Sequence, residues 1–278
     1  MAQEPPPRSY EELITILGPD FAHQIESNFS GCKSVAQLEE RLASIPLFVA
    51  AQQGQVELVR LLLEHQADTG LCDQQGFSPL LVAAECGHVQ VVQVLLEHQA
   101  DTGLCAKEGI SPLLVATEKG HVEVVQVLLE HQADTGLCDQ EGFSPLHMAA
   151  EKGHVEVVQV LLEHQADIEL CNQQGASPLF IAAQEGHLET AQVLLDKAAD
   201  IERGMHVGWS PLFVASWSGH ATMVAELLAR GADRDRTTTA AHLEIPTGST
   251  ALSVAELEGH DEVAALLREN GEQTSGDG

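Results

Sequence analysis

A proline that recurs every 33 residues constrains this chain more than any other feature of its sequence. A glycine lies eight residues after each of these prolines, and from Gly87 onward a histidine follows that glycine. A further copy contains Gly259-His260, which lies 40 residues after Gly219-His220. Self-similarity at such a period indicates a tandem array, in which each unit buries its apolar face against the next. The prolines are Pro46, Pro79, Pro112, Pro145, Pro178 and Pro211.

Each unit is predicted to form two short helices. Ser78 and Ser111 are good N-cap residues, and the proline after each suits the first position of a helix. The first helix then spans residues 79–86 and ends at Gly87, and a second helix spans Val89–Glu97. Because isolated helices of fewer than about 12–15 residues are marginal, stacking must stabilise the array. The apolar face of the second helix consists of Val91, Val92, Leu95 and Leu96.

Two stretches of the array carry a known pattern. Residues 76–84 read Gly-Phe-Ser-Pro-Leu-Leu-Val-Ala-Ala and residues 142–150 read Gly-Phe-Ser-Pro-Leu-His-Met-Ala-Ala, and each stretch is followed by a Gly-His pair. In these residues the chain resembles ankyrin repeats, over roughly residues 45–271. The resemblance implies an all-α fold, an ankyrin-repeat solenoid of about seven helix-turn-helix units with β-hairpin loops. The expected units span residues 45–75, 76–108, 109–141, 142–174, 175–207, 208–240 and 248–271.

The array departs from the ankyrin pattern at three positions. The family's Thr-Pro-Leu-His keeps its histidine only at His147, and apolar residues such as Leu81 and Phe180 replace it elsewhere. Glutamine replaces the usual glycine after the second helix, where a left-handed backbone would cost about 1 kcal/mol per site. The family's hairpin asparagine, a hydroxylation position, is also replaced, so we expect no such modification. The glutamines are Gln66, Gln99, Gln132 and Gln165, and the hairpin residues are Gly70, Gly103, Gly136, Glu169 and Glu202.

Outside the repeats, we expect residues 1–8 and 272–278 to be disordered. Capping and stop signals predict a short helical cap in residues 9–44; the alternative is a docking module with a partner of its own. Thr237–Pro246 holds the seven extra residues before the last repeat and predicts a long, exposed hairpin tip. The sequence shows no secretion signal and no long apolar run, so we expect a cytoplasmic protein, with a nuclear location left open.

Charge disfavours several classes of partner. The chain has 13 Lys and Arg against 42 Asp and Glu, a net charge of −29, which predicts no binding to nucleic acid or to anionic membranes. No Lys or Arg lies between Arg60 and Lys107, which favours a partner with a basic surface. The alternative is an acidic face that is simply solvated. Much of the charge is copied with the repeat, as at Asp68, Asp101, Asp134 and Asp167.

Repeated Cys and His residues form ladders rather than reactive sites. Stacked helices lie about 8–10 Å apart, too far for disulfides within the cysteine ladder or for a zinc ion shared within a histidine ladder. We therefore expect packing cysteines, structural histidines, no metal and no cofactor. No phosphate loop, nucleophile elbow or metalloprotease motif is present, so we expect no catalytic residues and no enzyme. The ladders are Cys72, Cys105, Cys138 and Cys171; His88, His121, His154, His187 and His220; and His65, His98, His131 and His164.

Positions that differ between copies are the candidates for partner binding. One lies between the glycine and the serine of the hairpin tip, where apolar residues predict an exposed binding stripe or, alternatively, packing between hairpins. Another is the pair of residues before the interhelical glycine. Trp209 and Trp217, the only tryptophans, form the favoured hot spot. The predicted partner-binding residues are Phe77, Glu85, Ile110, Glu118, Lys119, Phe143, Glu151, Lys152, Trp209 and Trp217.

Together these features predict a non-catalytic, monomeric scaffold or adaptor that binds a protein partner. The resemblance implies that the partner meets the hairpin tips and the first helices, which form the concave ankyrin surface. Two alternatives remain at this point. One is an acidic regulatory inhibitor that masks a basic surface, and the other is a regulatory subunit that docks on an enzyme through residues 9–44.

Overall fold

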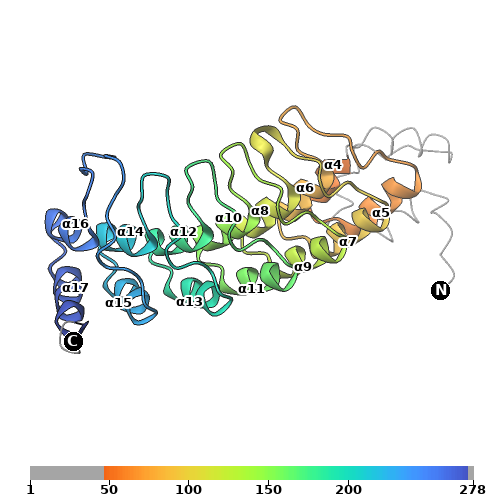
Figure 1. Cartoon of the computed structure of the whole chain (residues 1–278). Coiled ribbons are helices and arrows are strands. Elements are labelled where there is room, and N and C mark those ends of the chain that lie inside the picture. The colour runs from red at the N-terminus through yellow and green to blue at the C-terminus, as the bar shows by residue number, and fades with distance from the viewer. Residues whose placement is uncertain (1–46, 275–278) are drawn as a thin grey trace, which may run out of the picture. The chain divides into compact units, whose positions relative to one another are not determined.

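The computed structural model describes residues 47–274, and within this range it contains fourteen α-helices and one short 3-10 helix (Figure 1). The α-helices form seven successive pairs, which confirms the predicted all-α fold of helix-turn-helix repeats. The chain divides into two compact units, with the boundary between Asp134 and Thr135. The predicted segments 1–8 and 9–44 lie outside the described residues.

In each unit the helices form two rows. The first helices of the pairs pack side by side, as do the second helices, and each first helix also packs on its own partner. The first unit holds α4 (Leu47–Gln52), α5 (Val56–Glu64), α6 (Pro79–Glu85), α7 (Val89–Glu97), η1 (Lys107–Gly109), α8 (Pro112–Glu118) and α9 (Val122–Glu130). The second unit holds α10 (Pro145–Lys152), α11 (Val155–Glu163), α12 (Pro178–Glu185), α13 (Leu188–Asp196), α14 (Pro211–Ser218), α15 (Ala221–Ala229), α16 (Ala251–Glu258) and α17 (Asp261–Thr274).

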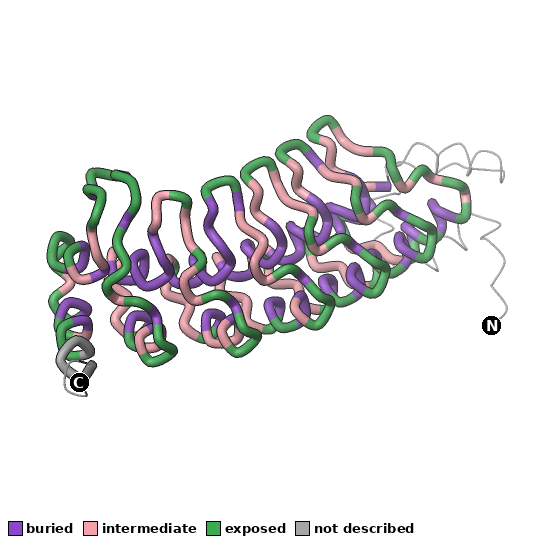
Figure 2. The backbone as a smooth tube through the Cα atoms, viewed as in Figure 1, coloured by how far each residue is buried: buried purple, intermediate pink, exposed green. Residues whose placement is uncertain are grey.

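The predicted caps and apolar faces are present. Ser78 Oγ accepts a hydrogen bond from Leu81 N at 3.2 Å, and the same bond forms at Ser111. Ala83 and Ala84 of α6 are fully buried, so the neighbouring first helices approach closely. In Figure 2 the buried residues follow the helices, whereas the tips of the connecting loops are mostly exposed. Burial between repeats, rather than within one, therefore holds each pair in place.

From the second repeat onward a histidine stands at the start of the second helix, and it joins repeats that follow each other within a unit. The Nε2 atom of His121 lies 3.0 Å from the backbone oxygen of Glu85, at the end of the preceding first helix. Gly87, which ends that helix, has φ +74°, and a Cβ atom there would lie 2.8 Å from Cε1 of His121. The glycine is thus required both for its backbone conformation and for space. Equivalent bonds to the preceding repeat are made by His88, His187, His220 and His260.

The glutamines after the second helices do adopt the left-handed conformation. Gln99 has φ +62°, and Gln66, Gln132 and Gln165 each have φ +63°. At the end of α7, the N–H of Gln99 bonds to the oxygen of Leu96 and the N–H of Ala100 bonds to the oxygen of Leu95. This is a helix C-cap of the kind that normally takes glycine.

Replacing Gln99 with glycine should therefore stabilise the protein. Glycine has no Cβ penalty at positive φ, so we expect Gln99→Gly to raise the free energy of unfolding by about 1 kcal/mol, and with it the thermal midpoint. Gln93→Gly, at an exposed position inside α7, is the control and should lower stability by about 1 kcal/mol. Thermal melts followed by circular dichroism measure both, and an unchanged midpoint for Gln99→Gly would contradict the assignment.

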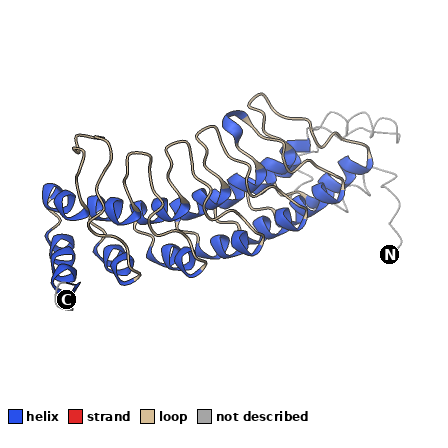
Figure 3. Ribbon diagram, viewed as in Figure 1, coloured by secondary structure: helices blue, strands red, loops and turns tan. Residues whose placement is uncertain are grey.

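The connecting loops turn as hairpins but contain no regular strands within residues 47–274 (Figure 3). Asp73 Oδ1 accepts the N–H groups of Gln75 and Phe77, both at 2.8 Å, and thereby sets the turn. The second loop has Ala106 at the equivalent position and forms the 3-10 turn η1 instead, with Glu108 at φ +69°. Neighbouring loops are bonded to each other, for example from Lys107 N to the oxygen of Gln75 at 3.4 Å.

The C-terminal end of the array departs slightly from expectation. Helix α17 continues to Thr274, three residues past the predicted repeat boundary at 271. The long loop before α16 is mostly exposed, as predicted, but Thr238 and Ile245 are buried. Ile245 is paired with His242 in an antiparallel bridge that closes the loop tip.

Candidate partner-binding site

The two residues before each interhelical glycine lie in the last turn of a first helix, and none of their side chains is buried in the described repeats. The backbone at this position is nevertheless fixed, because the oxygens of Glu85, Glu151 and Trp217 each accept the histidine bond from the following repeat. The backbone thus belongs to the scaffold, while the side chain can vary. The pairs are Gln52-Gln53, Glu85-Cys86, Glu118-Lys119, Glu151-Lys152, Gln184-Glu185, Trp217-Ser218 and Leu257-Glu258.

Two of these pairs carry opposite charges that lie in contact. The ammonium of Lys119 lies 3.3 Å from Glu118 Oε1, and the ammonium of Lys152 lies 2.6 Å from Glu151 Oε1. All four side chains are about one-third exposed. Solvated pairs of this kind contribute at most about 1 kcal/mol to stability.

Three of the predicted hairpin-tip residues lie at the surface in part. Phe77, Ile110 and Phe143 are half-buried. The ring of Phe143 is tilted against that of His147, with 5.7 Å between centroids. Asp139 Oδ1 holds the backbone N–H of Phe143 at 2.8 Å, so the side chain is presented from a fixed turn.

The expectation that every tip residue is exposed is wrong for two of them. Trp209 is 2% exposed and Ala176 is 1% exposed. The ring of Trp209 packs against Phe213 at 5.0 Å, against Trp217 at 5.5 Å and against His242 at 5.4 Å between centroids. Because His242 belongs to the long loop, that loop covers the tryptophan. Trp209 is therefore a core residue, and only Trp217, which is half-buried, keeps a surface that a partner can reach.

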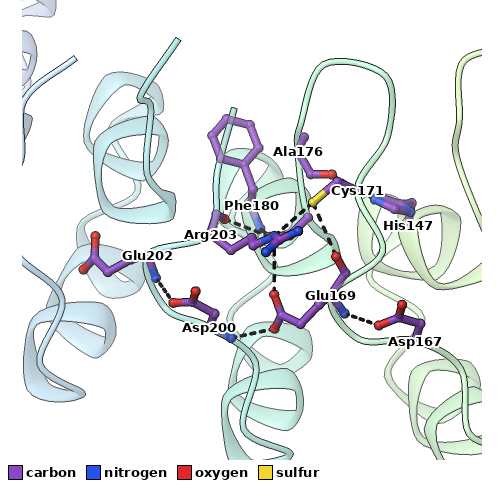
Figure 4. A network of polar contacts seen from close by, with 10 residues as sticks. His147, Asp167, Glu169, Cys171, Ala176, Phe180, Asp200, Glu202 and Arg203 are labelled. Atoms are coloured by element: carbon purple, nitrogen blue, oxygen red, sulfur yellow. Dashed lines mark hydrogen bonds and ion pairs between the residues drawn. The ribbon is translucent and has the colours of Figure 1, made fainter. Parts of the chain in front are cut away.

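Figure 4 shows a polar network between the repeats of the second unit that the sequence did not predict. Glu169 Oε1 accepts the backbone N–H of Asp200 at 2.7 Å, and its Oε2 lies 3.8 Å from Arg203 Nε. The same Nε donates to Cys171 Sγ at 3.2 Å. Glu202 repeats the arrangement with the N–H of Asp233 at 2.7 Å. The two glutamates at the family's hairpin asparagine position thus tie successive repeats together.

Two thiols of the first unit, those of Cys72 and Cys105, are held in their neutral form. Burial, followed by the carboxylates of Asp73 and Asp68, raises the pKa of Cys72. Burial and Asp101 likewise raise the pKa of Cys105. Both thiols donate to the backbone oxygen two residues earlier at 3.3 Å. They are structural groups of the loop and weak nucleophiles, since the thiolate is the reactive form.

Residues 47–274 contain neither a metal-binding cluster nor a membrane-spanning helix. No group of three or more His, Cys, Asp or Glu side chains in this range is arranged to hold a metal ion. None of its helices is long and apolar enough to cross a bilayer.

The fold and these surface positions agree with a known family. A family model of ankyrin repeats, which describes three consecutive copies, matches residues 24–104, 98–172 and 164–238. The chain belongs to the ankyrin-repeat family. Ankyrin repeats are in general modules of protein–protein interaction.

Similar ankyrin folds are found among solved structures. The crystal structure of the human ASB11 ankyrin repeat domain matches with a TM-score of 0.71 and 26% sequence identity, over 81% of this chain and 97% of that chain. In all, 557 chains of solved structures match, so partner choice has to come from residues that differ between ankyrin repeats rather than from the fold. A search of curated proteins gives no match.

Proposed function

We propose that this ankyrin-repeat chain is a non-catalytic scaffold or adaptor that binds a protein partner through its pre-glycine side chains and the exposed hairpin-tip residues. One observation carries the proposal. The pre-glycine backbone is held by a bond that recurs in both units, while the side chains there are exposed or half-buried and change from repeat to repeat. Variation at solvent-accessible positions of a fixed backbone is what recognition requires.

Site-directed crosslinking tests this surface. A photo-crosslinking side chain is placed in turn at Glu85, Glu118 or Glu151, and the full chain is exposed to lysate of its native cell. The controls carry the same group on exposed positions of the second helices, at Gln93, Gln126 and Gln159. We expect one or a few shared partners to be captured from the pre-glycine positions and not from the controls. Capture from the second helices alone would reject the proposed surface.

A second candidate is an acidic inhibitor that masks a basic surface. It is supported by the absence of Lys and Arg between Arg60 and Lys107, where Glu64, Glu97 and Asp101 are exposed. An inhibitor should compete with the ligand of its target and lose affinity steeply with added salt, whereas a scaffold should bind two partners at once. The third role, an enzyme's regulatory subunit, rests on residues 9–44, which lie outside the described residues.

A further inference from the structure

The last two repeats carry apolar residues where the others carry polar ones. At the first pre-glycine position, repeats six and seven have Trp217 and Leu257. Leu257 is 65% exposed, and Trp217 is half-buried. Helices α14 and α16 pack side by side, so these two residues occupy neighbouring places on one face. The residues at this position in the first five repeats are Gln52, Glu85, Glu118, Glu151 and Gln184.

The long loop adds a third apolar side chain in a strained conformation. Leu243 and Glu244 have φ +48° and +66°, between the bridged residues His242 and Ile245. A two-residue hairpin with both φ values positive normally takes Asn or Gly, and leucine there costs about 1–2 kcal/mol. Leu243 is nevertheless 61% exposed. Since His242 rests on Trp209, which in turn contacts Trp217, the loop tip is fixed beside the first helix of repeat six.

The charge around these residues is mostly negative. No Lys or Arg lies between Arg236 and Arg268, whereas this stretch holds five acidic residues, all of them exposed. One of them, Glu256, is paired with Arg268. The five are Glu244, Glu256, Glu258, Asp261 and Glu262.

We propose that Trp217, Leu243 and Leu257 form a C-terminal apolar patch that binds a protein segment with large apolar side chains flanked by lysine or arginine. The proposal deepens the proposed function, on which it rests. Exposed leucines and a tryptophan supply the anchoring contacts, since removal of apolar surface from water drives such association. The acidic residues that flank the patch select basic neighbours in the segment and repel an acidic one.

Binding of synthetic peptides of about 12 residues to the full chain tests whether the patch selects an apolar core with basic flanks. The first has a core of Leu and Phe between lysines, the second has the same core between glutamates, and the third has a serine core between lysines. Intrinsic fluorescence reports binding directly, because Trp209 and Trp217 are the only tryptophans of the chain. We expect a saturable change with the first peptide only, and weaker binding as salt is added. No saturable change, or an equal response to the glutamate-flanked peptide, would overturn the proposal.

Three variants locate the binding within the chain. Leu257→Gln places the residue of repeats one and five at this position, and Leu243→Gly removes the side chain while relieving the strained backbone. Leu71→Gln is the matched control, because Leu71 is 60% exposed but lies in the first unit. We expect affinity for the first peptide to fall about tenfold in the first two variants and to be unchanged in the control.

Equal affinity of Leu257→Gln and Leu71→Gln would reject the patch. If the lysine-flanked peptide does not bind while Glu85, Glu118 and Glu151 still capture shared partners, the proposed function stands and the patch fails. If no pre-glycine position captures a partner but the lysine-flanked peptide binds as described, the patch stands and the wider surface fails.

Discussion

Gly87→Ala should lower the free energy of unfolding by about 2–3 kcal/mol. The backbone at Gly87 has φ +74°, which costs a residue with a Cβ about 1–2 kcal/mol. The new Cβ would also lie 2.8 Å from the ring of His121, so the ring must move and lose its bond to the oxygen of Glu85. That loss adds about 1 kcal/mol. Urea unfolding followed by circular dichroism measures the sum.

Two controls separate the strain from the lost bond. Gly231 has φ +91° but no atom within 4 Å of an added Cβ, so Gly231→Ala should cost only the backbone strain. In a His121→Ala background, Gly87→Ala should likewise cost only about 1–2 kcal/mol. Equal losses for Gly87→Ala and Gly231→Ala would show that the histidine contact contributes nothing.

The second large effect is expected at His147, which is fully buried in α10. Its Nδ1 accepts the N–H of Ser144 at 3.3 Å, and its Nε2 lies 3.0 Å from the oxygen of Ala176 in the next repeat. His147→Ala removes one of the two hydrogen bonds that this oxygen accepts, the other coming from the N–H of Asn172, and it opens a cavity, so we expect a loss of about 3–4 kcal/mol. His147→Leu fills the space, as leucine does at Leu81 and Leu114, and should lose only about 1–2 kcal/mol. Tryptophan fluorescence during urea unfolding follows the unit that contains His147.

His147 also makes stability depend on pH. Burial lowers its pKa below the ordinary value of about 6.5. As pH falls through 6.5, the unfolded chain binds a proton at this site that the folded unit excludes, so the stability present at neutral pH is progressively lost. The slope from this one residue is at most about 1.4 kcal/mol per pH unit. His147→Leu should show a shallower loss of stability between pH 7.5 and 5.5 than the wild type; identical slopes would contradict this role.

The periodic residues of the sequence were sufficient to predict the repeat scaffold. The proline, the glycine and the histidine each have one physical role, which recurs along the described repeats, although repeat one has Gln55 in place of the histidine and repeat seven has Ala251 in place of the proline. Even the left-handed glutamines, such as Gln99 at φ +62°, follow from their place after the second helix. Repetition makes such positions predictable, because the same local conformation recurs in each repeat with equivalent neighbouring residues.

The structure of residues that do not recur with the 33-residue repeat could not be predicted in this way. The insertion before repeat seven has no copy elsewhere in the chain, so nothing in the pattern indicated that His242 covers Trp209. The loop with Ala106 in place of aspartate forms η1, whereas the loop with Met205 at the same position does not, so the sequence did not indicate where η1 forms. Of the candidate site, the pre-glycine positions were predictable from variation between copies, whereas the exposure of the hairpin tips depends on packing that only the structure shows.

The histidine bond between repeats has a consequence for how such a surface evolves. The histidine bonds to a backbone oxygen, as at Glu85, Glu151 and Trp217. The hydrogen bond between repeats therefore does not depend on which side chain stands at that position. Mutations there can accumulate with little effect on folding, since surface substitutions usually change stability by no more than about 0.5 kcal/mol. Repeats copied by duplication can therefore drift apart in what they bind while they remain interchangeable as building units.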